Sequence, residues 1–301
     1  SDNNFDWYQI NFPALKKNNR SFSYPYLVDI DGDKDLDIIC GNKQGKIEWI
    51  INQGTQNLPD WRIHELNLSQ IDVGSHSAPL LEDMDNDDDF DMLVGNSKGL
   101  IIYFENEGKN NLPYYVLRST RITGLQLKAN STPAFWKWNE DKHPDLFVGN
   151  REGSISLITH SPPENSPIFR GWNLHNSKWQ NIKNIGNSAP HFADFDKDNK
   201  TDLMMGDMQG NLIFWKNKGL KKSERFKKGK NLELAKNSLE VENKKNEENE
   251  ENENITTSDT SLKNKENLES ETFVPKFELV SKKFGNLDLG RRSFPAFMDI
   301  D

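Results

Sequence analysis

The 301-residue sequence contains a single cysteine, Cys40, and no long apolar run. One thiol cannot form a disulfide within the chain, and because Cys40 lies in an apolar stretch we expect a buried, unreactive side chain. No stretch reaches the roughly 18 apolar residues of a transmembrane helix, so the sequence predicts no membrane-spanning segment. The first residues lack the basic-then-apolar pattern of a signal peptide, so either one has been removed or there was none.

Catalytic signatures are missing as well. There is no Gly-x-Ser-x-Gly elbow, no His-Glu-x-x-His motif and no nucleotide-binding glycine loop. The six histidines are scattered, and we expect them to be exposed or hydrogen-bonded. The net charge of −9 argues against nucleic acid as a partner. These absences predict a protein that is not an enzyme.

What the sequence has in abundance is aspartate at a fixed spacing. Three nine-residue segments carry Asp at positions 1, 3, 5 and 9, namely Asp29, Asp31, Asp33 and Asp37, then Asp83, Asp85, Asp87 and Asp91, and then Asp194, Asp196, Asp198 and Asp202. Position 7 holds Asp35, Asp89 and Lys200. Carboxylates this close repel strongly unless a cation lies among them, and oxygen ligands of this kind suit Ca²⁺. The sequence therefore predicts three complete calcium sites.

An EF-hand loop also opens with Asp at positions 1, 3 and 5, but it requires Gly at position 6 and Glu at position 12. The first segment has Lys34 and Cys40 there, and the other two segments also lack both residues. Short apolar runs such as Leu-Asp-Ile-Ile follow at once and favour strands over helices. We therefore reject the EF-hand interpretation.

The acidic spacing is part of a longer repeat. The first residues of successive segments are Asp29, Asp83, Lys137, Asp194 and Asp299, most of them about 54 residues apart, and a proline lies four residues before each. One unit contains four apolar segments separated by turn residues, at roughly 24–28, 36–41, 46–52 and 60–66. A single four-stranded sheet cannot bury both faces alone, so the repeat predicts an all-β fold, a β-propeller of four-stranded blades.

These units resemble the FG-GAP/VCBS repeat family, the calcium-binding blades of the integrin alpha-chain propeller. Asp29-Ile-Asp-Gly-Asp-Lys-Asp-Leu-Asp37 and Asp83-Met-Asp-Asn-Asp-Asp-Asp-Phe-Asp91 both follow a proline-containing segment and precede an apolar one, as in that family. The resemblance implies that the calcium loops lie on one rim of the propeller. It also implies that position 7, which is Asp35, Asp89 or Lys200, gives its backbone carbonyl to the ion.

The third segment departs from the pattern, with Lys137, Asn139, Asp141 and Asp145 at positions 1, 3, 5 and 9. Lysine at position 1 removes a ligand and adds a positive charge. We expect its ammonium group to take the place of the ion, which leaves the loop from Lys137 to Asp145 metal-free. The alternative is a weakened metal site.

The domain organisation follows from the repeat, which extends over residues 1–301. The step from Asp194 to Asp299 is nearly twice the period, because residues 221–272 are inserted between two strands of one blade. This insertion is rich in Lys, Glu and Asn and poor in aromatics, so we predict that it is disordered, with a partner-binding segment as the alternative. Propellers of the resembled family commonly have seven blades. About four and a half are present here, so we expect the sequence to be a fragment of a longer protein.

The function that these features predict is a calcium-binding, non-enzymatic adhesion or ligand-binding module. Extracellular calcium modules bind at about 10⁻⁴ to 10⁻³ M, so we expect a secreted protein that is extracellular, on the cell surface or periplasmic. Its ligand would be a protein or a glycan at the propeller face. Similar calcium propellers also occur as lectins and polysaccharide lyases, so a carbohydrate-active protein is one alternative, and a structural subunit of a surface assembly is another. The oligomeric state is left open.

Overall fold

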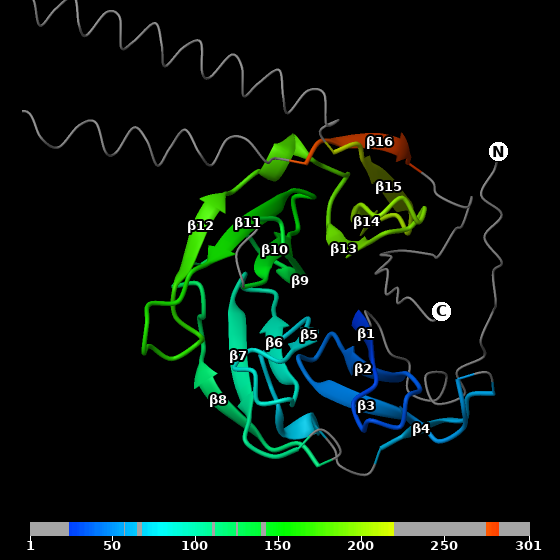
Figure 1. The fold of residues 1–301 in the computed structure, drawn as a ribbon, viewed down its shortest axis with the longest axis vertical. Helices are drawn as coiled ribbons and strands as arrows, with labels where there is room; N and C mark the ends of the chain where they lie inside the picture. Colours follow the sequence, from blue (N-terminus) through cyan, green and yellow to red (C-terminus); the bar gives the residue numbers. More distant parts are fainter. Residues whose placement is uncertain are drawn as a thin grey trace, which may run out of the picture. The chain divides into compact units, whose positions relative to one another are not determined.

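The computed structural model describes residues 24–56, 58–64, 68–109, 112–124, 126–139, 143–219 and 275–282. The regular structure in these residues is sixteen β-strands and two short 3-10 helices, Leu68–Gln70 (η1) and Trp179–Asn181 (η2) (Figure 1). The strands form four antiparallel sheets of four strands each in a propeller arrangement. This confirms the predicted all-β fold and the four-stranded blade. None of the described helices is long and apolar enough to cross a bilayer.

The four sheets, called blades 1 to 4 here, each use four consecutive strands in chain order. Blade 1 consists of β1 (Tyr24–Val28), β2 (Asp37–Gly41), β3 (Ile47–Asn52) and β4 (Trp61–Ile63). Blade 2 consists of β5 (Ala78–Glu82), β6 (Asp91–Gly95), β7 (Ile101–Asn106) and β8 (Tyr115–Ser119). Blade 3 consists of β9 (Thr132–Trp136), β10 (Asp145–Gly149), β11 (Ile155–His160) and β12 (Trp172–Asn176). Blade 4 consists of β13 (Ala189–Ala193), β14 (Asp202–Gly206), β15 (Leu212–Asn217) and β16 (Phe277–Ser281).

The chain separates into two compact units, one of residues 1–216 and 279–301 and one of residues 217–278. Within the second unit, the Lys218 amide donates a 2.8 Å hydrogen bond to the Lys276 carbonyl, and Lys218 forms an exposed ion pair with Glu278. Residues 221–272, Asp141 and the acidic segment that begins at Asp299 lie outside the described residues.

The second strand of every blade is buried along its whole length. Between its first aspartate and its last glycine this strand is apolar on both faces, and it has a sheet neighbour on either side. Between blades 1 and 2 this produces a continuous core that includes Ile39, Trp49, Met92, Val94 and Phe104. The most apolar segment of the repeat is therefore the centre of the hydrophobic core.

A repeated glycine–serine contact sets the distance between neighbouring blades. The amide of Asn42 donates a 2.8 Å hydrogen bond to Oγ of Ser77, and Asn96 and Ser131 make the same contact at 2.9 Å. A Cβ atom on Gly41 would lie 2.1 Å from the Ser77 carbonyl oxygen. Blade 1 can approach blade 2 this closely, and blade 2 can approach blade 3, because glycine precedes the asparagine in both contacts.

The first strands, β1, β5, β9 and β13, lie next to one another. Together they line a cavity of about 450 Å³. The proline of each repeat lies on these strands, Pro25 and Pro79 among them, as expected for the edge strand of a sheet, where the missing amide donor is tolerated. The acidic segments follow directly, because each connects the first strand of a blade to the second.

Candidate metal centres

The three predicted acidic loops fold alike. In blade 1, the Asp29 carboxylate accepts hydrogen bonds from the amides of Gly32, at 2.8 Å, and Lys34, at 3.0 Å. Gly32 and Lys34 have positive φ angles of 80° and 75°. In blade 2, Asn86 and Asp88 take the same backbone conformation and donate their amides to Asp83. Glycine, asparagine and aspartate favour this conformation, so the local sequence supports the turn that folds the carboxylates together.

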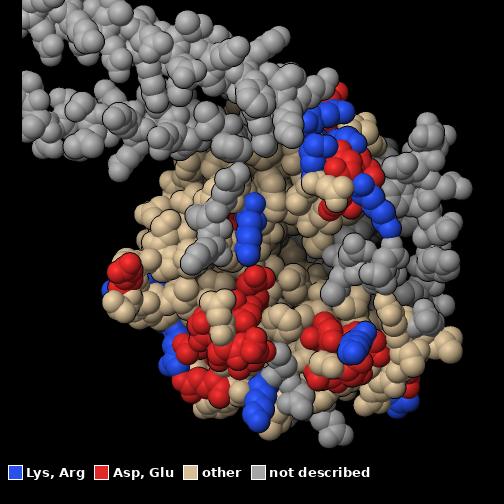
Figure 2. Space-filling view, in the orientation of Figure 1, with Lys and Arg blue, Asp and Glu red and all other residues tan. Residues whose placement is uncertain are grey.

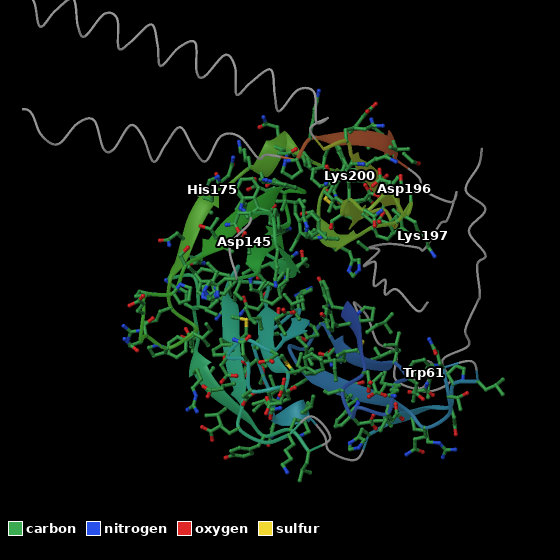
Figure 3. All side chains as sticks on the ribbon, viewed as in Figure 1. Trp61, Asp145, His175, Asp196, Lys197 and Lys200 are labelled. Carbon is green, nitrogen blue, oxygen red and sulfur yellow. The ribbon has the colours of Figure 1, made fainter. Side chains whose placement is uncertain are left out.

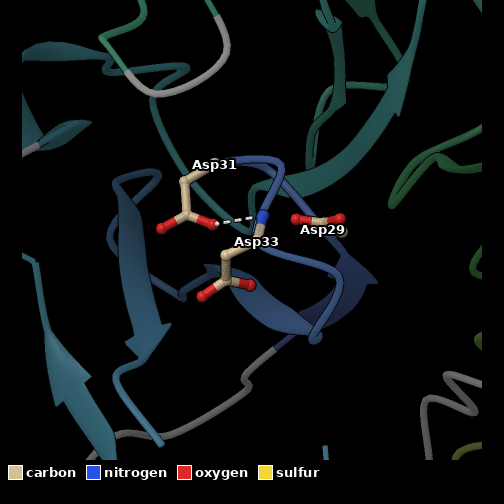
Figure 4. Close-up of side chains that lie close together, drawn as sticks. All are labelled: Asp29, Asp31 and Asp33. Atoms are coloured by element: carbon tan, nitrogen blue, oxygen red, sulfur yellow. Dashed lines mark hydrogen bonds between the residues drawn. The ribbon is translucent and has the colours of Figure 1, made fainter. Parts of the chain in front are cut away.

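This turn gathers three carboxylates around one space in each loop. One oxygen atom from each member lies within 4.8 Å of the others in the triads Asp29, Asp31 and Asp33, then Asp83, Asp85 and Asp87, and then Asp194, Asp196 and Asp202. Figure 4 shows the first triad, in which the Asp33 amide also donates a 3.3 Å hydrogen bond to Asp31. Figure 2 shows acidic side chains gathered over blades 1, 2 and 4 on the face that is viewed.

The aspartate at position 9 has a structural role that the spacing alone did not reveal. Asp37 Oδ1 accepts a 2.8 Å hydrogen bond from the Asn52 amide at the end of β3, and Asp91 Oδ1 accepts one of the same length from Asn106. In blade 3, Asp145 accepts the equivalent bond from His160. The residue thus joins the start of the second strand to the end of the third. Burial raises the pKa of both Asp37 and Asp91 to about 7.

The aspartate at position 7 is buried beneath the loop. Asp35 and Asp89 are 6% and 9% exposed, and Oδ1 of each accepts no hydrogen bond. Burial, followed by repulsion from Asp87, raises the pKa of Asp89 to about 6, and burial followed by repulsion from Asp33 raises that of Asp35. Hydrogen bonds from the side chains of Asn52 and Asn106 only partly offset these rises in pKa. A buried carboxylate with one unpartnered oxygen is costly unless a positive charge compensates it. The backbone ligand expected at this position stays a prediction, and the buried side chain is a second candidate.

The loop of blade 4 differs because lysines reach its carboxylates. Lys216 Nζ, on β15, donates to Oδ2 of Asp196 and lies 3.2 Å from Oδ2 of Asp198, which also accepts a 2.8 Å hydrogen bond from Lys200. The hydrogen bonds from Lys200 and then from Lys216 hold the pKa of Asp198 below its ordinary value. Figure 3 shows Asp196, Lys197 and Lys200 close together at this loop. In this loop the triad consists of Asp194, Asp196 and Asp202.

The comparison with known proteins agrees with this architecture. Residues 29–94 match the model of the FG-GAP-like repeat. This part of the chain is an FG-GAP-like repeat region. The matched span runs from the first acidic loop to the second strand of blade 2, and so includes both loops that have an aspartate at position 7. No curated protein matches the chain.

The third unit keeps the four strands of the repeat, but Lys137 replaces the first aspartate of its loop. Lys137 is exposed. Burial raises the pKa of Glu82 above its ordinary value, and the positive charge of Lys137 opposes part of that rise. Asn139 and Asp145 are described, whereas Asp141 is not. The metal-free state of this loop therefore stays a prediction.

The donor sets of the first two FG-GAP units fit a hard divalent cation. Each has carboxylate oxygens gathered within 4.8 Å, and each has a buried carboxylate oxygen without a donor. Oxygen-only ligands in this number are those that Ca²⁺ takes. The residues that would hold it are the aspartates at positions 1, 3, 5 and 9 together with position 7, and the ion would supply the positive charge that they lack.

Proposed function

We propose that this FG-GAP repeat protein is a calcium-stabilised binding module. It binds a protein or glycan ligand at the propeller face and catalyses no reaction on it. The observation that carries the proposal is the pair of buried, donor-free carboxylate oxygens on Asp35 and Asp89, each beneath a triad of further carboxylates. Burying a charged aspartate is costly, and a bound cation would offset that cost.

The ion has a structural role in this proposal. Each loop joins the first strand, which lines the central cavity, to the second strand, which is the core of the blade. Without a cation, its carboxylates repel one another by several kcal/mol in sum, even at an effective dielectric constant of about 20. Calcium would remove this repulsion and fix the position of the first strand. The loop would therefore hold the propeller face in shape.

The location follows from the affinity of such sites. Calcium modules that work outside cells bind at about 10⁻⁴ to 10⁻³ M, which matches the calcium concentration there. We therefore place the module in an extracellular, cell-surface or periplasmic environment. The buried single thiol Cys40 is compatible with an oxidising compartment, because it is not available to pair with a second chain.

A non-catalytic role is supported by the use of the acidic residues. The paired carboxylates that general acid–base catalysis would need are gathered at the spacing of metal ligands. The cavity between the first strands is lined mainly by apolar and proline residues, including Tyr26, Leu80 and Phe135. Such a lining suits the binding of a side chain or a sugar face more than the activation of a nucleophile.

The experiment that tests this function presents the protein to panels of polysaccharides and extracellular matrix proteins, in calcium and in chelator. Retention is measured on immobilised ligand, and released products are analysed by mass spectrometry. We expect retention on one class of ligand in calcium, loss of retention in chelator, and no product. A product released from a polysaccharide would contradict the non-enzymatic proposal and identify a lyase or hydrolase.

A further inference from the structure

The four blades differ at one position of the third strand, the residue before its last. This position is Ile51 in β3, Glu105 in β7, Thr159 in β11 and Lys216 in β15. The backbone of the next residue contacts position 9 of the acidic loop in blades 1 to 3. The variable residue therefore lies beside the loop, and its charge changes from blade to blade.

In blade 4 this residue is a cation in direct contact with the loop. Lys216 Nζ donates to Asp196, whose side chain is 13% exposed, and lies 3.2 Å from Asp198. The Lys216 ammonium group is the donor of this hydrogen bond, and the Asp196 carboxylate accepts it. Lys200 adds a second ammonium group to Asp198 at 2.8 Å. The positive charge that an ion would bring is thus partly present within the chain.

In blade 2 the same position adds a negative charge. Glu105 immediately precedes Asn106, whose amide donates a 2.8 Å hydrogen bond to Asp91 of the loop, so an acidic residue lies next to this contact. Arg118, on β8, forms ion pairs with both Glu105 and Glu107. In blade 1 the position is Ile51, which is buried and carries no charge. The next-to-last residue of the third strand is therefore acidic in blade 2, uncharged in blade 1 and basic in blade 4.

The loops themselves follow the same order. The loop of blade 2 has six aspartates and no lysine, that of blade 1 has five aspartates and Lys34, and that of blade 4 has four aspartates with Lys197 and Lys200. Calcium affinity of an oxygen site rises with the number of charged ligands. The composition of the loop and the third-strand residue therefore both favour stronger calcium binding in blade 2 than in blade 1, and weaker binding in blade 4.

We infer that Lys216 is an internal counter-cation of the blade 4 loop, and that the three acidic loops bind calcium with graded affinity, tightest in blade 2 and weakest in blade 4. This inference rests on the proposed calcium function. Calcium in blade 4 has to displace the ammonium group of Lys216 from Asp196, whereas Ile51 offers no competition in blade 1. Lys216 therefore sets the calcium affinity of the blade 4 loop without being a ligand of the ion.

The test is a calcium titration of the whole chain by isothermal titration calorimetry, with native mass spectrometry to count the ions. The variants are Lys216→Ile, which installs the residue of blade 1, and Glu105→Ile. The control is Lys98→Ile, which removes a lysine from the turn between β6 and β7, at the opposite end of blade 2 from its acidic loop. We expect two tight ions and one weak ion in the wild-type protein. Lys216→Ile should lower the Kd of the weak site by about tenfold or more, and Glu105→Ile should raise the Kd of the tightest.

A second measurement separates competition from misfolding. In chelator, Lys216→Ile should melt below the wild type, because the blade 4 carboxylates lose their internal cation, and added calcium should restore the melting temperature. If three calcium ions bind with equal affinity, and Lys216→Ile changes none of the Kd values, this inference is wrong but the proposed function is not affected. A wild-type protein that binds no calcium at all would contradict the proposed function as well.

Discussion

The hydroxyl of Tyr103 donates a 2.7 Å hydrogen bond to Oδ2 of Asp91. Both side chains are buried, Tyr103 in the third strand of blade 2 and Asp91 at the end of its acidic loop. Burial raises the pKa of Tyr103, so its hydroxyl keeps its proton and remains a donor. The contact joins the hydrophobic core of the blade directly to the candidate metal centre.

Tyr103→Phe should therefore destabilise the protein. The substitution leaves a buried carboxylate oxygen without its donor, which costs about 1–3 kcal/mol. Urea unfolding monitored by tryptophan fluorescence measures the change. Tyr114→Phe is the matched control, because Tyr114 is 62% exposed and should change nothing. Equal stability of the two variants would contradict the role of the buried contact.

Asp31→Ala should have opposite effects in calcium and in chelator. In calcium, the variant should bind one ion fewer and melt at a lower temperature than the wild type. In chelator, it should be at least as stable as the wild type, because one of the mutually repelling charges is gone. Asp60→Ala, which changes an exposed aspartate paired with Arg62, is the control. If the melting temperature of Asp31→Ala falls equally in calcium and in chelator, the role of Asp31 does not depend on calcium.

Gly95→Ala should destabilise the contact between blades 2 and 3. A Cβ atom on Gly95 would lie 2.2 Å from the Ser131 carbonyl oxygen, a backbone atom that cannot move without shifting the blade. We expect a loss of about 3 kcal/mol or more. Gly124→Ala is the control, because Gly124 has a φ angle of 64° but no atom near the added Cβ. Its cost should be about 1 kcal/mol, from the backbone conformation alone. Similar losses for both variants would contradict the steric account.

Cys40 reports on the opening of blade 1. The thiol is 4% exposed in β2, the strand that begins at Asp37 of the acidic loop. It should react slowly with a thiol reagent in calcium and many times faster in chelator, because loss of the ion releases the start of the strand. The rate is followed by absorbance with an aromatic disulfide reagent. Fast modification of Cys40 in the folded, calcium-loaded protein would show that the ion does not fix the position of β2.

The fold could be predicted largely from the sequence because the repeat is strong. The segment expected at 24–28 is β1, and the segments expected at 36–41 and 46–52 are β2 and β3 within one residue at each end. Of the segment expected at 60–66, β4 covers Trp61–Ile63, and residues 65 and 66 lie outside the described residues. The extent of an edge strand depends on its partner, which apolar periodicity does not reveal.

The candidate site could be predicted only in part. The spacing identified the aspartates of each triad, because they are close in sequence. It did not reveal that Lys216 contacts Asp196, because the lysine lies on a different strand from the loop. Alignment of the repeats would have given a signal, since Ile51 and Glu105 hold the same place as Lys216. The hydrogen bond from Asn52 to Asp37 was also missed, because its donor is a backbone amide.

The most direct test of calcium as the stabilising ion is a thermal melt of the whole chain, followed by circular dichroism, in millimolar calcium and in excess chelator. Removal of the ion leaves the clustered carboxylates of blades 1 and 2 to repel one another, and several kcal/mol of repulsion correspond to a fall in melting temperature of many degrees. Magnesium at the same concentration is the control, and it should restore little of the loss, because it prefers a smaller octahedral site. A melting temperature that is the same in calcium and in chelator would contradict the central claim.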